Sequence, residues 1–209
     1  LEERIYRDAL TLYANDGFGQ FSDVTTEAGL SGVDAYGMGV AVGDYDGDGW
    51  VDLFMTAVGE NHLFHNTEGR FQEVTHQARV AGGADAWSTG ATFFDANNDG
   101  LMDLYVANYV VWSRDIDIEV DYRLTGIGRA YGPPSNFQGT QPYLYINQGN
   151  GQFVESAETA GLVVTHPTTR LGIGKGLAVI AVDLNQDQRM DLVVANDTTR
   201  NFVYLNQTD

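Results

Sequence analysis

Residues 39–56 read GVAVGDYDGDGWVDLFMT, a turn of aspartates and glycines between two apolar runs. This pattern predicts two strands joined by a loop. The loop, residues 44–52, places carboxylates at its positions 1, 3, 5 and 9 and a backbone carbonyl at position 7. Calcium takes about six to eight oxygen ligands in irregular geometry, so the loop predicts a calcium site at the tip of a β-hairpin. Gly49, at position 6, suits the sharp reversal because glycine reaches left-handed backbone angles without a side-chain clash.

Two other interpretations of this stretch are open. An EF-hand loop begins in the same way, but it is flanked by helices and ends in a glutamate at position 12. Position 12 here is Met55, inside an apolar run, which favours a hairpin over an EF-hand. An acidic hairpin turn that binds no ion is the second alternative, because aspartate and glycine are ordinary turn residues.

The motif occurs twice more, and its recurrence favours metal binding. A second loop spans residues 95–103 and a third spans residues 183–191, each with oxygen-bearing side chains at positions 1, 3, 5 and 9. Position 12 is Val106 in the second copy and Val194 in the third. Independent turns have little reason to keep the same series of oxygens. The sequence therefore predicts about three calcium ions, which would bring the formal charge from −18 to about −12.

Composition limits the class of protein. The chain has 209 residues, 43% of them apolar, which is enough for one sizeable globular core. Its net charge of −18 would repel a phosphate backbone and argues against a nucleic-acid partner. No apolar run approaches the roughly 20 residues of a membrane span, and the charged N-terminal stretch LEERIYRDAL is not a secretion signal. The absence of cysteine excludes disulfides and cysteine-based metal sites.

A second repeated segment lies between the loops. Each copy reads as a short strand ending in Asn, a turn, a second strand around Phe and a segment of small residues. The copies are Leu12–Leu30, Leu63–Val80 and Leu144–Leu162. Together with the loop hairpin, one unit has four short strands in about 50 residues, which is typical of a β-propeller blade. The prediction is an all-β propeller over residues 1–209 with three calcium-hairpin repeats.

The ends of the chain do not coincide with the ends of the repeats. The chain stops at FVYLNQTD, where a turn and a Phe strand are expected, while residues 17–25 supply such a turn and strand at its beginning. Three blades are too few to close a propeller, which needs about four to eight. We therefore expect either further blades beyond Asp209 or completion by other copies of the chain.

A long insertion separates the second and third units. The first two loops begin 51 residues apart and the next two 88 apart, and most of the excess lies in residues 109–140. This segment contains Trp112, Tyr122 and Tyr131, which suit the binding of a protein or a glycan. Long insertions often carry function. The alternative is a packed connector that covers exposed strand edges.

The sequence resembles the FG-GAP/VCBS repeats of integrin-α-like propellers, and more closely the propeller of the ASPIC/UnbV (cartilage acidic protein-like) group. Three stretches carry the resemblance: the repeat LYxNxGxGxFxDVTxxAGL, the insertion end GPPSNFQGTQPYLYINQG, and GKGLAVIAVDLNQDQRMDLVVANDTTRNFVYLN. The resemblance covers nearly the whole chain from about Leu12. It implies a secreted or surface-exposed calcium-binding propeller. Two departures limit it, since the cysteines common in the group's insertion and the C-terminal domain that names the group are both missing here.

The resemblance also implies the metal ligands, loop by loop. The position-7 residues Trp50, Leu101 and Arg189 would act only through their backbone carbonyls. The expected ligands are Asp44, Asp46, Asp48, Trp50 and Asp52 in loop one; Asp95, Asn97, Asp99, Leu101 and Asp103 in loop two; and Asp183, Asn185, Asp187, Arg189 and Asp191 in loop three.

The third loop differs from the other two at position 6. Gln188 replaces the glycine there, and a side chain costs about 1 kcal/mol or more in the left-handed region. We therefore predict that loop three binds calcium most weakly and that loop one, with four carboxylates, binds it most tightly.

Other motifs do not predict a site. The segment Gly172–Gly176 lacks the Ser or Thr that follows the lysine of a Walker loop, and a strand rather than a helix is expected after it. The four histidines are expected to be exposed or hydrogen bonded, since His62 and His65 point to opposite faces of a strand and His76 and His166 are isolated.

The sequence predicts a non-enzymatic, extracellular or cell-surface module. It would bind calcium and act in protein or glycan interaction, or as a structural component that assembles with other copies of itself. The alternative is an accessory or catalytic propeller domain of a secreted carbohydrate-active enzyme, which rests on analogy of fold alone.

Overall fold

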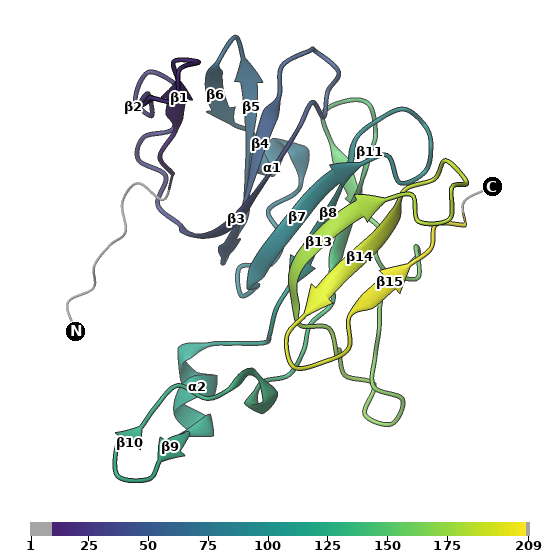
Figure 1. The fold of residues 1–209 in the computed structure, drawn as a ribbon. Coiled ribbons are helices and arrows are strands. Elements are labelled where there is room, and N and C mark those ends of the chain that lie inside the picture. Colours follow the sequence, from purple (N-terminus) through teal and green to yellow (C-terminus); the bar gives the residue numbers. More distant parts are fainter. Residues whose placement is uncertain (1–9, 208–209) are drawn as a thin grey trace.

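The computed structural model describes residues 10–207, and these form an all-β chain of successive small sheets (Figure 1). The predicted domain, residues 1–209, extends beyond this range. Residues 1–9 of the charged N-terminal stretch lie outside the described residues. A short antiparallel hairpin comes first, made of β1 (Tyr13–Asn15) and β2 (Phe21–Asp23). It corresponds to the last two strands of a unit.

Two four-stranded antiparallel sheets follow, and each contains the predicted four-strand unit. The first sheet contains β3 (Tyr36–Gly43), β4 (Asp52–Val58), β5 (His62–Thr67) and β6 (Arg70–Glu73), in that order. The second contains β7 (Ser88–Phe94), β8 (Asp103–Asn108), β11 (Tyr143–Asn147) and β12 (Phe153–Glu155). Loop one joins β3 to β4 and loop two joins β7 to β8, so both acidic loops are hairpin tips as predicted.

The third sheet has three strands within the described residues. They are β13 (Gly176–Val182), β14 (Asp191–Asn196) and β15 (Phe202–Tyr204), with loop three between the first two. The arrangement is consistent with a β-propeller-like fold in which each sheet is one blade. The described blades form an open series rather than a closed ring (Figure 1).

The first strands of the blades lie next to one another, so β7 contacts both β3 and β13. The approach is close because glycine occupies the contact points. A Cβ atom added to Gly90 would lie 2.9 Å from the Cα atom of Ala178, and one added to Gly39 would overlap the carbonyl oxygen of Thr89. These glycines allow neighbouring backbones to touch where the blades converge.

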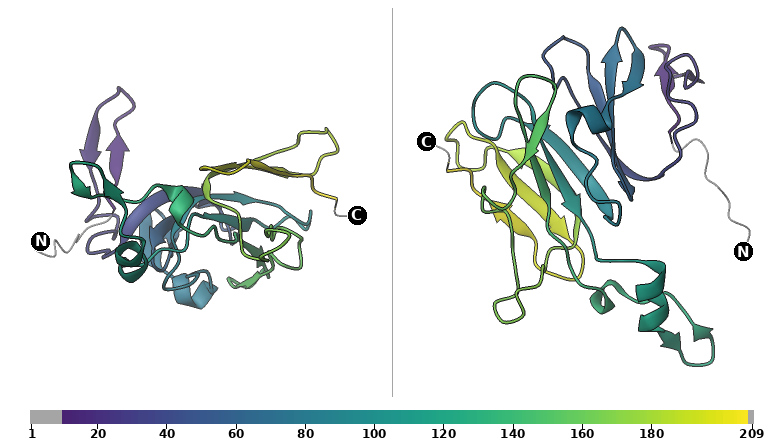
Figure 2. Two further views of the ribbon diagram at one scale, coloured as in Figure 1. Left: turned by 90° about the horizontal axis from the view of Figure 1, so that it is seen from below. Right: turned by 180° about the vertical axis from the view of Figure 1, so that it is seen from behind.

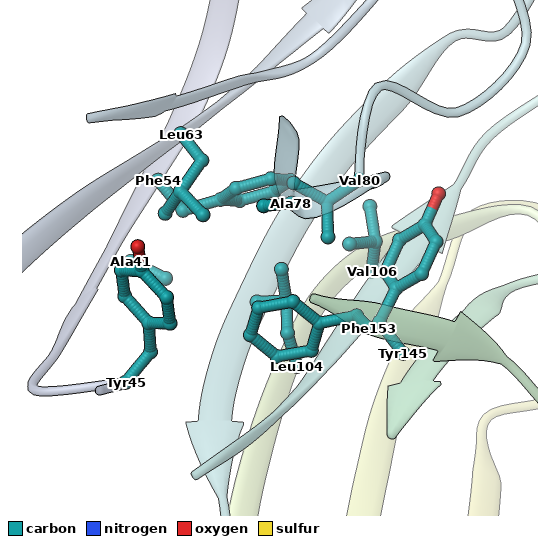
Figure 3. Packing of buried hydrophobic residues seen from close by; sticks show 10 residues of the cluster. All are labelled: Ala41, Tyr45, Phe54, Leu63, Ala78, Val80, Leu104, Val106, Tyr145 and Phe153. Carbon is teal, nitrogen blue, oxygen red and sulfur yellow. The ribbon is translucent and has the colours of Figure 1, made fainter. Parts of the chain in front are cut away.

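Apolar side chains fill the space between blades. Figure 3 shows the cluster between the first two sheets, in which Phe54 and Leu63 of the first blade face Leu104 and Phe153 of the second. A second cluster lies between the second and third blades, and a third covers the outer side of the first blade. Each repeated small-residue segment supplies part of one cluster, for example Val80, which follows helix α1 (Thr75–Ala78).

The insertion, residues 109–140, forms an arm that extends away from the sheets (Figures 1 and 2). It contains helix α2 (Arg114–Val120), the hairpin of β9 (Arg123–Leu124) and β10 (Gly128–Arg129), and the 3-10 helix η1 (Pro134–Asn136). At its base, the Trp112 ring packs edge-on against Trp87, with ring centroids 5.8 Å apart. Lys175, the single lysine of the chain, donates to the Pro134 carbonyl at 2.6 Å. Tyr131 is 92% exposed.

No helix within residues 10–207 is long and apolar enough to cross a membrane. The glycine-rich segment before β13 leads into this strand and not into a helix, which agrees with its rejection as a dinucleotide site.

Buried threonines tie each blade to the next, and this predicts a measurable loss of stability. The Thr89 hydroxyl lies 2.7 Å from the Gly176 carbonyl oxygen of the third blade and 3.1 Å from that of Ala107 in its own blade. In T89V the shape is kept but these bonds are lost, so we expect the free energy of unfolding to fall by about 1–3 kcal/mol.

Urea denaturation checks this, with T92V in the same strand as the control, because the Thr92 hydroxyl makes only a 3.4 Å contact with the next carbonyl. The control should change by less than about 0.5 kcal/mol. Equal effects of the two variants would contradict a bridging role for Thr89.

Candidate metal centres

The three acidic loops share one pattern of hydrogen bonds around the position-1 aspartate. In loop one, the two oxygens of Asp44 accept the backbone N–H groups of Gly47, Asp48 and Gly49 at 2.8, 3.1 and 3.0 Å. Asp183 accepts the three corresponding N–H groups in loop three, and Asp95 accepts two of them, those of Asp99 and Gly100, in loop two. The loop backbone is therefore wrapped around one carboxylate in each case.

Positions 3 and 5 continue the pattern. The side-chain oxygens of Asp46, Asn97 and Asn185 accept the N–H of the position-5 residue. The position-5 carboxylates accept the N–H of Trp50, Leu101 and Arg189, at 2.8 to 2.9 Å. These bonds hold alternate side-chain oxygens on one side of the loop. In loop one, carboxylate oxygens of Asp44, Asp46 and Asp48 lie within 4.8 Å of one another, close enough to share a cation.

The position-9 aspartates differ from the others because they have no exposed surface. Asp52, Asp103 and Asp191 are all 0% exposed. One oxygen of each accepts the N–H of loop position 2, for example Tyr45 at 3.1 Å. The other oxygen accepts the N–H of the asparagine near the end of the third strand, at 2.8 Å in all three blades. Position 9 thus joins the loop to the third strand.

The same asparagines connect neighbouring loops. The Asn147 side-chain amide donates to the Met102 carbonyl in its own loop at 3.0 Å and to the Tyr45 carbonyl in loop one at 2.7 Å. Asn206 does the same for loops three and two, donating to the Ala96 carbonyl at 2.8 Å. Each loop after the first is therefore bonded to the loop of the preceding blade.

Burial disfavours the charged form of two of these carboxylates. Burial raises the pKa of Asp103 to about 6, because loss of hydration outweighs the two backbone hydrogen bonds that favour the charged form. The charges of Asp99 and Asp95 act in the same direction. Burial also raises the pKa of Asp52. A bound divalent cation would stabilise the charged form of both, so the residues present fit a metal site.

One side chain near loop one is absent from the predicted ligand set. His65, on β5, places its Nδ1 atom 3.2 Å from an Asp52 oxygen and 3.3 Å from an Asp46 oxygen. The other histidines agree with expectation, since His62 bonds Glu73 at 2.8 Å and His166 accepts two backbone N–H groups. His65 immediately precedes the asparagine that bonds position 9, but its approach to loop one depends on the pairing of β5 with β4, so the sequence pattern did not reveal it.

The third loop adopts the backbone conformation that its sequence disfavours. Gln188 has φ +69°, against +90° for Gly49 and +86° for Gly100 at the same position. The Arg189 guanidinium also bonds the Asp187 carboxylate, at 2.9 Å, and so competes with a cation for it, whereas the position-7 residues of the other loops, Trp50 and Leu101, carry no charge. Both features agree with the prediction that loop three is the weakest site, which stays a prediction.

Exchanging residues at position 6 tests the cost of this conformation. Q188G should raise the free energy of unfolding by about 1 kcal/mol, because glycine reaches this φ without a clash. G49Q should lower it by a similar amount, since no other atom lies within 4 Å of a Cβ at Gly49 and backbone strain is the main penalty. Urea denaturation measures both. A destabilised Q188G, or a neutral G49Q, would contradict this account.

Comparison with known proteins identifies the repeat. Residues 5–55 and 44–106 match the family described as FG-GAP-like repeat. The chain contains FG-GAP-like repeats. The two matches overlap at residues 44–55, which include loop one. Loop one therefore lies at the end of the first match and at the start of the second, and loop two lies inside the second. Loop three lies beyond the matched residues, but its hydrogen bonds repeat those of the first two.

The chain is also similar to cartilage acidic protein 1 of Mus musculus, with 24% identity over 214 residues. The alignment covers 80% of this chain and 32% of the mouse protein, so the chain spans about a third of the length of the curated relative it matches. The relation to FG-GAP propellers and to the cartilage acidic protein-like group, expected from the sequence, is confirmed. Repeats of this type are generally non-catalytic interaction modules.

Proposed function

We propose that this FG-GAP-repeat chain is a calcium-binding, non-enzymatic interaction module, in which one ion bound by each acidic loop fixes the blades relative to one another. The observation that carries the proposal is the hydrogen-bond pattern shared by three loops. It holds side-chain oxygens of positions 1, 3 and 5 in the same arrangement at every hairpin tip. The proposed ligands are the fifteen residues predicted from the sequence.

Electrostatics explains why the ions would stabilise the fold. Loop one alone brings four carboxylates together, and the net charge of the chain is −18. Calcium supplies two positive charges and prefers oxygen ligands. Ions that bind only the folded form also stabilise it by mass action. Because the asparagine amides bond successive loops, fixing one loop restrains the next.

An extracellular or cell-surface location is part of the proposal. Calcium is abundant enough there to occupy weaker sites, which in extracellular modules reach dissociation constants of about 0.1–1 mM. The absence of cysteine means that metal ions, rather than disulfides, would supply the cross-links. The enzyme alternative rests only on the versatility of propeller folds. It is disfavoured because FG-GAP-like repeats are generally non-catalytic.

Removal of metal should weaken the fold. We expect the midpoint of thermal unfolding to fall when excess chelator replaces calcium, and to return when calcium is restored. The D44N/D95N/D183N variant should retain a similar midpoint in both conditions, because each loop loses its position-1 charge. Circular dichroism or calorimetry follows the transition, and magnesium at equal concentration is the control. A wild-type midpoint that does not respond to chelator would contradict the structural role of calcium.

We further propose that the two outermost faces of the blade series bind another blade of the same repeat. Val40 of β3 is 60% exposed, yet the residues at the same repeat position, Ala91 and Val179, pack against the preceding blade. Ile180 of β13 is 58% exposed, whereas its equivalent Ala41 is buried against the following blade. The exposed faces are therefore the two halves of an interface that the molecule already forms twice.

Such an interface joins unlike faces, so single-face variants test it. V40D should block the first face and I180D the second, and each variant alone should sediment as a monomer. An equimolar mixture should form a 1:1 complex, because each partner keeps one competent face. Wild type should form larger species as concentration rises. Wild type that stays monomeric, or a mixture that does not associate, would contradict association through these faces.

The arm of residues 109–140 is the proposed contact for a protein or glycan partner. The hairpin of β9 and β10 carries exposed apolar side chains, and Ile127, between its two strands, is 77% exposed. Of the aromatic residues expected to bind a partner, Tyr131 is exposed while Trp112 and Tyr122 are partly buried. Tyr131 is therefore the aromatic residue best placed for contact.

A further inference from the structure

We propose that His65, together with Asp46 and Asp52, makes loop one a mixed nitrogen and oxygen site for a borderline divalent transition-metal ion such as Zn²⁺. The three side chains come from two segments, the loop itself and strand β5. One ligand atom from each lies within 4.8 Å of the others. The inference rests in part on the proposed function, since Asp46 and Asp52 also belong to the predicted calcium loop.

The Nδ1 atom of His65 is the observation that carries the proposal. It is buried from solvent and has no hydrogen-bond partner among the described residues. Two carboxylate oxygens lie within 3.3 Å of it, but neither is aligned to accept a hydrogen bond. Burying a polar nitrogen without a partner costs free energy. A cation between this nitrogen and the two carboxylates would remove that cost.

The separations suit a small cation. Two atoms bound to one tetrahedral zinc ion at about 2.0–2.1 Å lie about 3.3 Å from each other. The distances from Nδ1 to the Asp46 and Asp52 oxygens, 3.3 and 3.2 Å, match this edge. Asp52 Oδ1 already accepts the Asn66 N–H at 2.8 Å, but a carboxylate oxygen has a second lone pair available.

The rest of the ring is held in the orientation that a ligand needs. The Nε2 atom of His65 lies 3.2 Å from the Thr67 hydroxyl oxygen. When Nε2–H donates to this oxygen, the proton is on Nε2 and the Nδ1 lone pair faces the carboxylates. Metal-binding histidines usually donate their second ring N–H to a fixed acceptor in this way. The Tyr45 ring lies edge-on to the imidazole, with ring centroids 6.3 Å apart, and limits its rotation.

The chemistry of this donor set differs from that of the other two loops. Residues Ile146 and Leu205 occupy the position equivalent to His65 in the second and third blades, so neither can donate a nitrogen. Imidazole favours zinc and other late first-row ions, whereas calcium prefers oxygen ligands alone. Loop one would therefore be the loop of the three that distinguishes a transition metal from calcium.

The test titrates Zn²⁺ into calcium-free, uniformly ¹⁵N-labelled protein and follows the histidine ring nitrogens by NMR, with isothermal titration calorimetry in parallel. We expect the His65 Nδ1 resonance to shift as the tightest site fills. The variant H65I introduces the residue found in the second blade. Its zinc affinity at the tightest site should fall by more than about 100-fold, because loss of a residue outside the ligand shell costs only about 10- to 100-fold.

Two variants complete the experiment. H76N removes an exposed histidine that lies 3.5 Å from Glu60, and it should leave the tightest zinc site unchanged. T67V should weaken zinc binding without abolishing it, because the ring loses the partner of Nε2. The far-ultraviolet circular dichroism spectrum of metal-free H65I should match that of the wild type and so establish that the variant is folded.

The outcomes separate this inference from the proposed function. Zinc that shifts no His65 nitrogen, or that binds H65I as tightly as wild type, overturns the inference even if calcium binds all three loops. Zinc binding at His65 in a protein that binds no calcium supports the inference and contradicts the calcium proposal.

Discussion

A buried carboxylate hydrogen bonded to two backbone segments at once holds each blade of this protein together. The position-9 aspartate of every loop has no exposed surface, and its oxygens accept one N–H from the start of the loop and one from the third strand. A buried carboxylate is costly unless its oxygens are bonded or its charge is balanced. This single residue therefore fixes the loop, the neighbouring strand and the position of the candidate metal centre.

The asparagine that bonds this aspartate extends the constraint from one blade to the next. Its side-chain amide reaches the loop of the preceding blade, so the hairpin tips form a connected row on one side of the sheets. Deeper in the molecule, glycines and bridging threonines bring the first strands together, and apolar clusters fill the space between sheets. The acidic loops cannot move independently of the blades, which is why ions bound at the tips would affect the stability of the whole chain.

The sequence predicted the repeating parts of the structure because they depend on local patterns. The alternation of apolar runs with Asp and Gly located all three hairpins, and the period of the repeat gave four strands per blade. Gln188 was recognised as a strained residue for the same reason, since its φ follows from its place in the loop.

Features that depend on distant residues were not predicted. Asn147 and Tyr45, which form one of the links between loops, are 102 residues apart, and the approach of His65 to loop one appears only when β5 pairs with β4. Helix α2 was also missed, because its alternating charged and apolar residues resemble a strand, although Ser113 caps its first turn.

If the acidic hairpin tips hold divalent cations, a crystal structure of the protein grown in calcium should show them. We expect an ion in each of the three loops, about 2.3–2.6 Å from oxygens of positions 1, 3, 5 and 9 and from the position-7 carbonyl. Loops that contain only water under saturating calcium, with the same hydrogen bonds intact, would contradict this expectation.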